Sequence, residues 1–184
     1  MKRKIYAGVG SKETPESIQK LMFKIAAILA KRGYILRSGA NDGADKAFEL
    51  GCVSVGGKKE IWLPWKEFNN HEDTGFYPNP GHFLKAEATL SYWSKLTQGA
   101  KRIHASKVAQ VLGAHLNEPV DFVICWTSDG AVTRDQCTTK TGETATIIIL
   151  ASDLNIPVIN IAAYNNIEVL EKDLKKLLRK IEAK

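Results

Sequence analysis

The chain has 184 residues, of which 44% are hydrophobic and 25% are charged, and its net charge is +6 with a pI near 9.2. These values are ordinary for a globular protein with one sizeable core. No apolar run reaches the roughly 18 residues that a membrane span needs, and the opening "MKRKIYAGVG" has no apolar signal core. We therefore expect a cytoplasmic protein without a membrane partner.

The positive charge favours anionic partners, either nucleotides or nucleic acid. Much of the excess lies at the two ends, however, and the closing "EKDLKKLLRKIEAK" is also typical of a solvated helix face. Cys52, Cys125 and Cys137 are odd in number and far apart, which indicates free thiols in a reducing compartment. The cysteines and histidines lack metal-ligand spacing, so we expect neither a metal nor a cofactor.

The first third of the chain alternates strands and helices. Residues 4–9, "KIYAGV", predict a buried strand that ends in a glycine turn. A helix follows, with Thr14 as the predicted N-cap and Gly33 as the stop. "YILRSG" predicts a second strand, residues 45–51 open a second helix, and "KKEIWLPW" predicts a third strand.

Residues 66–82 predict a long surface loop, and such loops are often functional. Helical patterns then cover residues 83–96 and 105–116, before the buried strand "VDFVICW" and the polar loop "TSDGAVTRDQCTTKTGE". "TATIIILASDLN" is ambiguous, but a crossover helix is needed before the next parallel strand, "IPVINI". An amphipathic helix over 166–183 completes the pattern.

The strands are continuous apolar runs that alternate with helices. This pattern predicts an α/β fold with a doubly wound, mostly parallel sheet and helices on both faces. We expect one domain over residues 1–184, with an inserted loop and helices at about 66–118. The helices over 83–116 are also a candidate interface for a homodimer or a higher homo-oligomer.

Ligands of such sheets bind outside the carboxyl ends of the strands. Three loops at that edge combine glycine with Ser, Thr or Asp: "GVGSKETP", "RSGANDGAD" and "TSDGAVTRD", the last continuing to "TKTGET". Glycine lets backbone N–H groups approach an anion, and a following helix adds partial positive charge. Each loop alone also fits a simple turn, but three on one edge favour a phosphorylated ligand.

Two common phosphate motifs are absent. "GVGSKE" places Glu13 where G-x-G-x-x-G needs its third glycine, and "TKTGET" lacks the Gly-Lys-Thr ending of a P-loop. An ordinary dinucleotide or nucleoside-triphosphate site is therefore not expected.

Several single residues have two interpretations. Arg37 either binds phosphate or forms an ion pair with an acid such as Asp42. Trp126 ends a strand at the same edge and either stacks on a base or belongs to the core. For Lys101, Arg102 and Lys107, a solvated helix face is favoured over phosphate binding.

The segments "KIYAGVGSKETP", "YILRSGANDGADKAFELG", "KEIWLPW", "AQVLG", "DFVICWTSDG" and "IPVINI", in this order, resemble the SLOG superfamily. That superfamily includes the Rossmann-like domain of DNA-processing protein A and the cytokinin-activating lonely-guy proteins. The resemblance spans about residues 4–162 and is greatest to a group of uncharacterised bacterial and bacteriophage proteins. It implies a Rossmann-like fold that binds a nucleotide or a nucleotide-derived small molecule.

The resemblance also implies site residues. Carried over by position, they are Gly8, Gly10, Ser11, Ser38, Gly39, Gly43, Asp45, Gly142 and Thr144. The three loops and their flanks add Arg37, Trp126, Thr127, Asp129, Gly130 and Glu143, and the family-like "HASKVAQVLG" adds His104. The superfamily's Ser-Gly-Gly-Ala is Ser38-Gly39-Ala40-Asn41 here and its Gly-Gly-Thr is Gly142-Glu143-Thr144, which implies an altered cradle. The histidines of the long loop, His71 and His82, either close over the ligand or are solvated.

Lonely-guy enzymes cleave the base–ribose bond with a glutamate that falls at Ile147 here. The missing acid weakens an enzymatic function, because a carboxylate is the natural stabiliser of an oxocarbenium-like state. Glu143, Asp129 and Asp45 are the candidate substitutes, although each also suits a loop, turn or helix-start role.

We therefore predict a nucleotide-binding module, of a sequestering or sensing kind that serves a phage. The alternatives are a nucleotide N-glycosidase and a single-stranded-DNA-binding relative of DNA-processing protein A. Nucleic acid is the less favoured partner, because the basic residues do not interleave with aromatic ones into a stacking surface.

Overall fold

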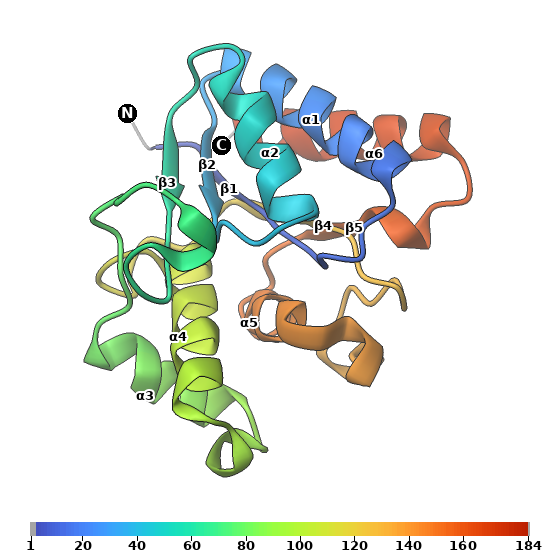
Figure 1. Ribbon diagram of the computed structural model, residues 1–184. Helices are drawn as coiled ribbons and strands as arrows, with labels where there is room; N and C mark the ends of the chain where they lie inside the picture. Colours follow the sequence, from blue (N-terminus) through green and yellow to red (C-terminus); the bar gives the residue numbers. More distant parts are fainter. Residues whose placement is uncertain (1–2, 184) are drawn as a thin grey trace.

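A computed structural model describes residues 3–183. Its centre is a five-stranded sheet in which all neighbouring strands are parallel, in the order β3-β2-β1-β4-β5 (Figure 1). The strands are β1 (Ile5–Gly8), β2 (Ile35–Ser38), β3 (Lys59–Ile61), β4 (Phe122–Cys125) and β5 (Val158–Asn160). In the register, Tyr6 of β1 lies between Leu36 and Phe122.

Helices cover both faces of the sheet (Figure 1). They are α1 (Glu16–Lys31), α2 (Ala44–Val53), α3 (Pro80–Thr89), α4 (Gln98–Leu112), α5 (Ala145–Asp153) and α6 (Ile167–Glu182). One hydrophobic core forms where α1, α2 and α6 pack on the sheet, and a second forms under α3, α4 and α5. The predicted doubly wound α/β architecture is confirmed.

Three helices begin at residues other than the predicted ones, because the residues that cap their N-termini differ from those expected. Thr14 is not the N-cap of α1, because its hydroxyl donates instead to the Ser11 carbonyl oxygen at 2.6 Å and Pro15 holds the cap position. The pattern over 83–96 is a helix only to Thr89, since α3 starts earlier at Pro80 behind the capping side chain of Asn79. Thr97 caps α4, which therefore begins well before residue 105.

His71 and His82, the histidines of the predicted long loop, each form hydrogen bonds that connect separate segments of the fold. His71 lies 2.8 Å from the Glu49 carboxylate on α2, which fastens the loop to that helix. The His82 ring accepts from the Asn79 N–H at Nδ1 and reaches the Gly113 carbonyl oxygen through Nε2, so it joins the start of α3 to the end of α4. Burial lowers the pKa of His82, which suits the neutral tautomer that these two bonds require. Neither histidine lines the cavity that the loops after β1 and β2 form with α4.

No helix within residues 3–183 combines the length and the apolar character needed to cross a membrane. In the same range, no three His, Cys, Asp or Glu side chains are grouped closely enough to hold a metal ion.

Candidate functional site

The strand order places a cleft at one edge of the sheet. The chain moves outward from β1 through β2 to β3, but β4 pairs on the other side of β1. The loops after β1 and β4 therefore diverge at the carboxyl ends of these strands, where open α/β sheets bind their ligands. This is the edge at which the three glycine-containing loops were expected to meet.

A cavity of about 500 Å³ opens there, a volume typical of small-molecule sites. We call it the first cavity. Its walls come from the loops after β1 and β2, the long loop after β3, α4 and the turn before α5. The lining residues are Gly10, Ser11, Lys12, Glu13, Asn41, Asp42, Phe68, Asn69, Ile103, Lys107, Thr141, Gly142, Glu143 and Thr144.

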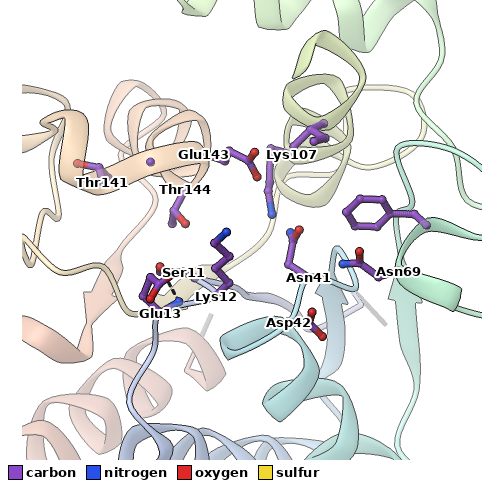
Figure 2. A pocket seen from close by; sticks show the side chains of 14 residues that line it. Ser11, Lys12, Glu13, Asn41, Asp42, Asn69, Lys107, Thr141, Glu143 and Thr144 are labelled. Carbon is purple, nitrogen blue, oxygen red and sulfur yellow. Dashed lines mark hydrogen bonds between the residues drawn. The ribbon is translucent and has the colours of Figure 1, made fainter. Parts of the chain in front are cut away.

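Polar groups from four elements converge on this cavity. Figure 2 shows the amino groups of Lys12 and Lys107 directed toward its centre, with the Asn41 amide and the Thr144 hydroxyl around them. The N-termini of α2 and α5 also lie at the cavity, since its walls include residues directly before each helix. Helix N-termini and lysines both favour an anion.

Asp45 connects the loops after β1 and β2 with Lys107 of α4, behind the wall of the cavity. Its side chain is fully buried on the first turn of α2 and accepts hydrogen bonds from the N–H groups of Gly10 at 3.1 Å and Asn41 at 3.3 Å. The Lys107 amino group lies 3.6 Å from the same carboxylate and is itself almost fully buried. Asp45 therefore positions both loops and the lysine, and it does not line the cavity.

Two glycines let the loops after β1, β2 and β4 approach one another closely. A Cβ on Gly10 would lie 2.7 Å from the Trp126 carbonyl oxygen, and one on Gly43 would lie 2.7 Å from that of Ser11. Gly43 also has a φ of +78°, which other residues rarely adopt. A Cβ on Gly39 would lie 2.5 Å from the Gln110 side chain and 3.1 Å from the Asp45 carboxylate, and one on Gly8 would lie 2.7 Å from the Phe48 ring. These four glycines shape the wall, and only Gly10 reaches the cavity itself.

Asp129 anchors the loop that supplies the opposite wall. Its carboxylate accepts from the hydroxyls of Thr127, Thr138 and Thr141 at 2.5–2.8 Å. Burial acts to raise the pKa of Asp129, but these hydroxyls and the Ala131 N–H outweigh it and lower the pKa to about 2. Since Thr141 lines the cavity, an ionised Asp129 fixes the turn that presents Gly142 and Thr144.

We expect Asp129→Asn to lower the free energy of unfolding by about 1–3 kcal/mol at pH 7, since an amide is a weaker acceptor for three hydroxyls. The depressed pKa means that this stabilisation is present above pH 4 and is lost as pH falls toward 2. Urea unfolding at pH 7 and at pH 3 measures both effects. Asp135→Asn, on an exposed aspartate of the same loop, is the matched control and should stay within about 0.5 kcal/mol of wild type. An equal loss in both variants would contradict this role.

Arg37 lies outside the cavity, in a buried ion-pair network. Its Nε is 2.6 Å from the Glu60 carboxylate, and its terminal nitrogens contact the Glu118 carboxylate at 2.5 Å and the Glu118 carbonyl oxygen at 2.6 Å. Asp42, the acid named above as an ion-pair partner, lines the cavity instead. Arg37 therefore ties β2 to β3 and to the segment before β4, and phosphate binding by its guanidinium is not supported.

Other predicted residues lie at the carboxyl ends of the strands and stabilise the loops there, but they do not line the first cavity. Ser38 donates to the Gly8 carbonyl oxygen at 2.7 Å, and the Thr127 N–H donates to the Asn160 side chain at 3.2 Å. The half-buried Trp126 packs on the core, and its carbonyl oxygen accepts from the Ser11 N–H at 3.1 Å. Gly130 packs near Ala163. His104 lines a neighbouring cavity.

Five predicted residues do line the first cavity: Gly10, Ser11, Gly142, Glu143 and Thr144.

Lys107 is the main residue that the sequence interpretation missed. The expected solvated face is wrong for this lysine, whose side chain is only 2% exposed. Lys107 is the one lysine between residues 104 and 112, all of which are buried in the structure. The sequence carries only a weak signal of this, namely a single lysine among mainly apolar residues. Phe68 and Asn69 come from the long loop, where Asn69 also donates to the Ala40 carbonyl oxygen at 3.1 Å.

Among the candidate catalytic acids, only Glu143 lines the cavity. Asp45 and Asp129 are engaged in the contacts given above. Ile147, the position where lonely-guy enzymes carry their glutamate, is fully buried in the second core.

One comparison with a solved structure supports the fold. No protein-family model matches the sequence, and no curated protein matches it. Among solved structures, DNA processing protein A from Helicobacter pylori, described by its single-stranded DNA binding mode, aligns with 85% of this chain at 18% identity and a TM-score of 0.50. The chain spans only 64% of that protein's length. The molybdenum cofactor carrier protein from Chlamydomonas reinhardtii aligns at 15% identity over 97% of this chain and 99% of its own, with a TM-score of 0.42.

The likeness to DNA processing protein A is at the level of the fold. It agrees with the all-parallel, Rossmann-like sheet observed here. At 18% identity it assigns no ligand to this chain.

Proposed function

We propose that the chain is a member of the SLOG superfamily and binds a nucleotide or a nucleotide-derived small molecule in the first cavity. The observation that carries the proposal is the convergence of Lys12, Lys107, Asn41 and Thr144 at the N-termini of two helices. The two lysines and the helix ends suit a phosphate group. Phe68 and Ile103 supply the apolar surface that a base or sugar would cover.

The charge balance of the lining favours a nucleotide over a bare anion. Two lysines, Lys12 and Lys107, line the cavity together with three acids, Glu13, Asp42 and Glu143. A site for phosphate alone would gain nothing from the acids. A nucleotide also carries ribose hydroxyls and base N–H donors, and carboxylates accept hydrogen bonds from both.

A thermal-shift panel tests this function. We expect mononucleotides at 1 mM to raise the melting temperature by several degrees, because a ligand at about 100 times its Kd stabilises the folded state by about 2.7 kcal/mol. Inorganic phosphate and nucleosides without phosphate should give smaller shifts. A flat response from well-folded protein to mononucleotides, dinucleotides and cyclic nucleotides alike would contradict the proposal.

A nucleotide N-glycosidase is the second candidate, and one observation favours it. The Glu143 carboxylate lines the cavity and lies in Figure 2 on the same side as the Lys107 amino group. A carboxylate there would stabilise positive charge developing on a ribose. Incubation of the protein with nucleoside monophosphates, followed by chromatography for free base, separates the two functions: a binding module releases none.

Single-stranded DNA is the third candidate ligand, because a protein of similar fold is described as binding it. Three acids against two lysines in the cavity disfavour a chain of phosphates. We expect no gel shift of an oligonucleotide even at low salt, where phosphate contacts are strongest.

A further inference from the structure

A second cavity, of about 640 Å³, lies beside the first. Its lining residues are Tyr92, His104, Arg134, Cys137, Thr138, Thr139, Gly142, Glu143, Ala145 and Ile149. Gly142 and Glu143 belong to both cavities, so the two spaces share these residues as a common wall. The two cavities therefore adjoin at these residues.

Helix α4 contributes one polar side chain to each cavity. Lys107 lines the first and His104 the second, and residues three apart lie on the same face of a helix. Thr146 of α5 holds the imidazole through a 2.7 Å contact between Nδ1 and Oγ1. The helix that presents a cation to the first cavity therefore presents an oriented ring to the second.

His104 is prepared to bind an uncharged group. The residue is only 5% exposed, and its Nε2 has no hydrogen-bond partner within residues 3–183 although the ring lines the cavity. Burial, with a further contribution from the positive charge of Lys107, lowers the pKa of His104 to about 4. The ring is therefore neutral near pH 7 and offers Nε2 for a hydrogen bond to a ligand.

The rest of the second cavity suits a flat, neutral ring. Tyr92 and Ile149 supply apolar surface, and the Tyr92 ring meets the His104 ring edge to face at 6.2 Å. The Thr139 hydroxyl adds a polar group, whereas the Thr138 hydroxyl is engaged with Asp129. The one basic side chain, Arg134, is already paired with Asp153 at 2.5 Å, so the cavity does not offer a free cation to a second phosphate.

We propose that the natural ligand is a nucleotide whose phosphate carries a second ring-bearing group, and that the second cavity holds this group. The nucleotide part lies in the first cavity, and the connection passes beside Gly142 and Glu143. This inference rests on the proposed function, and it narrows the ligand from any mononucleotide to a two-part molecule.

Isothermal titration with AMP, NAD and diadenosine diphosphate tests the inference. We expect at least one of the two dinucleotides to bind about tenfold or more tightly than AMP, since stacking of one further ring adds this much or more. Tyr92→Ala should remove that gain and leave the Kd for AMP unchanged. Thr139→Trp, which fills the second cavity from an exposed position, should do the same. Tyr164→Ala, at a half-buried tyrosine outside both cavities, is the matched control and should change neither Kd.

Each other outcome overturns the inference in a distinguishable way. If AMP binds but neither dinucleotide binds more tightly, the two-part ligand is wrong while the proposed function stands. If a dinucleotide binds more tightly but keeps its advantage in folded Tyr92→Ala and Thr139→Trp proteins, the second ring lies elsewhere. If AMP and both dinucleotides fail to bind, the inference fails, and the thermal-shift panel then decides the proposed function: a hit with another nucleotide keeps it, and a flat panel overturns it.

Discussion

Arg37→Met should lower the free energy of unfolding by about 3–5 kcal/mol at pH 7. The Arg37 side chain is 1% exposed and is paired with Glu60 and Glu118. Its loss leaves the 12%-exposed Glu60 carboxylate without its buried cation, whereas the 39%-exposed Glu118 carboxylate remains hydrated, and both carboxylates keep the exposed Arg3. Breaking a buried pair on one side has this cost because the remaining charge stays desolvated. Urea unfolding followed by circular dichroism measures the change.

A matched control and a pH series separate this effect from a general loss of packing. Arg134→Met breaks a pair with Asp153 whose two side chains are 45% and 43% exposed, and it should cost at most about 1 kcal/mol. Burial acts to raise the pKa of Glu60, but hydrogen bonds from Arg37 and Arg3 outweigh it and the pKa is lowered. The stabilisation is therefore present above the ordinary glutamate pKa and is lost below it, so the cost of Arg37→Met should shrink as pH falls below 4. A cost that stays constant down to pH 3 would contradict the ionic explanation.

Lys107→Gln should weaken AMP binding by about 10- to 100-fold. The Lys107 amino group is the buried cation of the first cavity, and a hydrogen bond to a charged group contributes about 1.5–3 kcal/mol. Lys107→Arg keeps the charge and should retain most of the affinity. Isothermal titration with AMP measures the dissociation constants of the wild-type, Lys107→Gln and Lys107→Arg proteins.

The Asp45 carboxylate complicates this test, because Lys107→Gln also leaves Asp45 buried without its cation. The double variant Asp45→Asn/Lys107→Gln removes both charges, and we expect it to regain stability relative to Lys107→Gln but not AMP affinity. If the double variant regained AMP affinity as well, Lys107 would act through the fold and would not contact the ligand.

The architecture could be predicted because apolar strands and helical patterns alternate along the whole chain. The three loops could be placed on one edge because all strands of a parallel sheet end there. The resemblance to the SLOG superfamily then implied Gly10, Gly142 and Thr144 within these loops, and all three line the first cavity.

Lys107 could not be assigned by the same reasoning. Helix α4 is buried from residue 104 to residue 112 because α3, α5 and the sheet surround it, so its polar residues do not mark a solvent face. An amphipathic pattern predicts which side of a helix is exposed, and it fails for a helix without an exposed side.

The ion pair that was one of the two interpretations of Arg37 is present, but its partners are Glu60 and Glu118. Its acids come from β3 and from the segment before β4, and their approach depends on β2 pairing with β3 and on β4 pairing with β1. Strand order is a long-range property that local sequence patterns do not report. Local reasoning therefore suggested an acid close in the sequence, such as Asp42.

The central claim is that the first cavity binds a nucleotide through its phosphate. Parallel titrations of the wild-type protein with AMP and with adenosine test it most directly, because the two ligands differ only in that phosphate. We predict that AMP binds at least about 100-fold more tightly than adenosine, from two or more hydrogen bonds to the phosphate. Equal affinities, or tighter binding of adenosine, would contradict the claim.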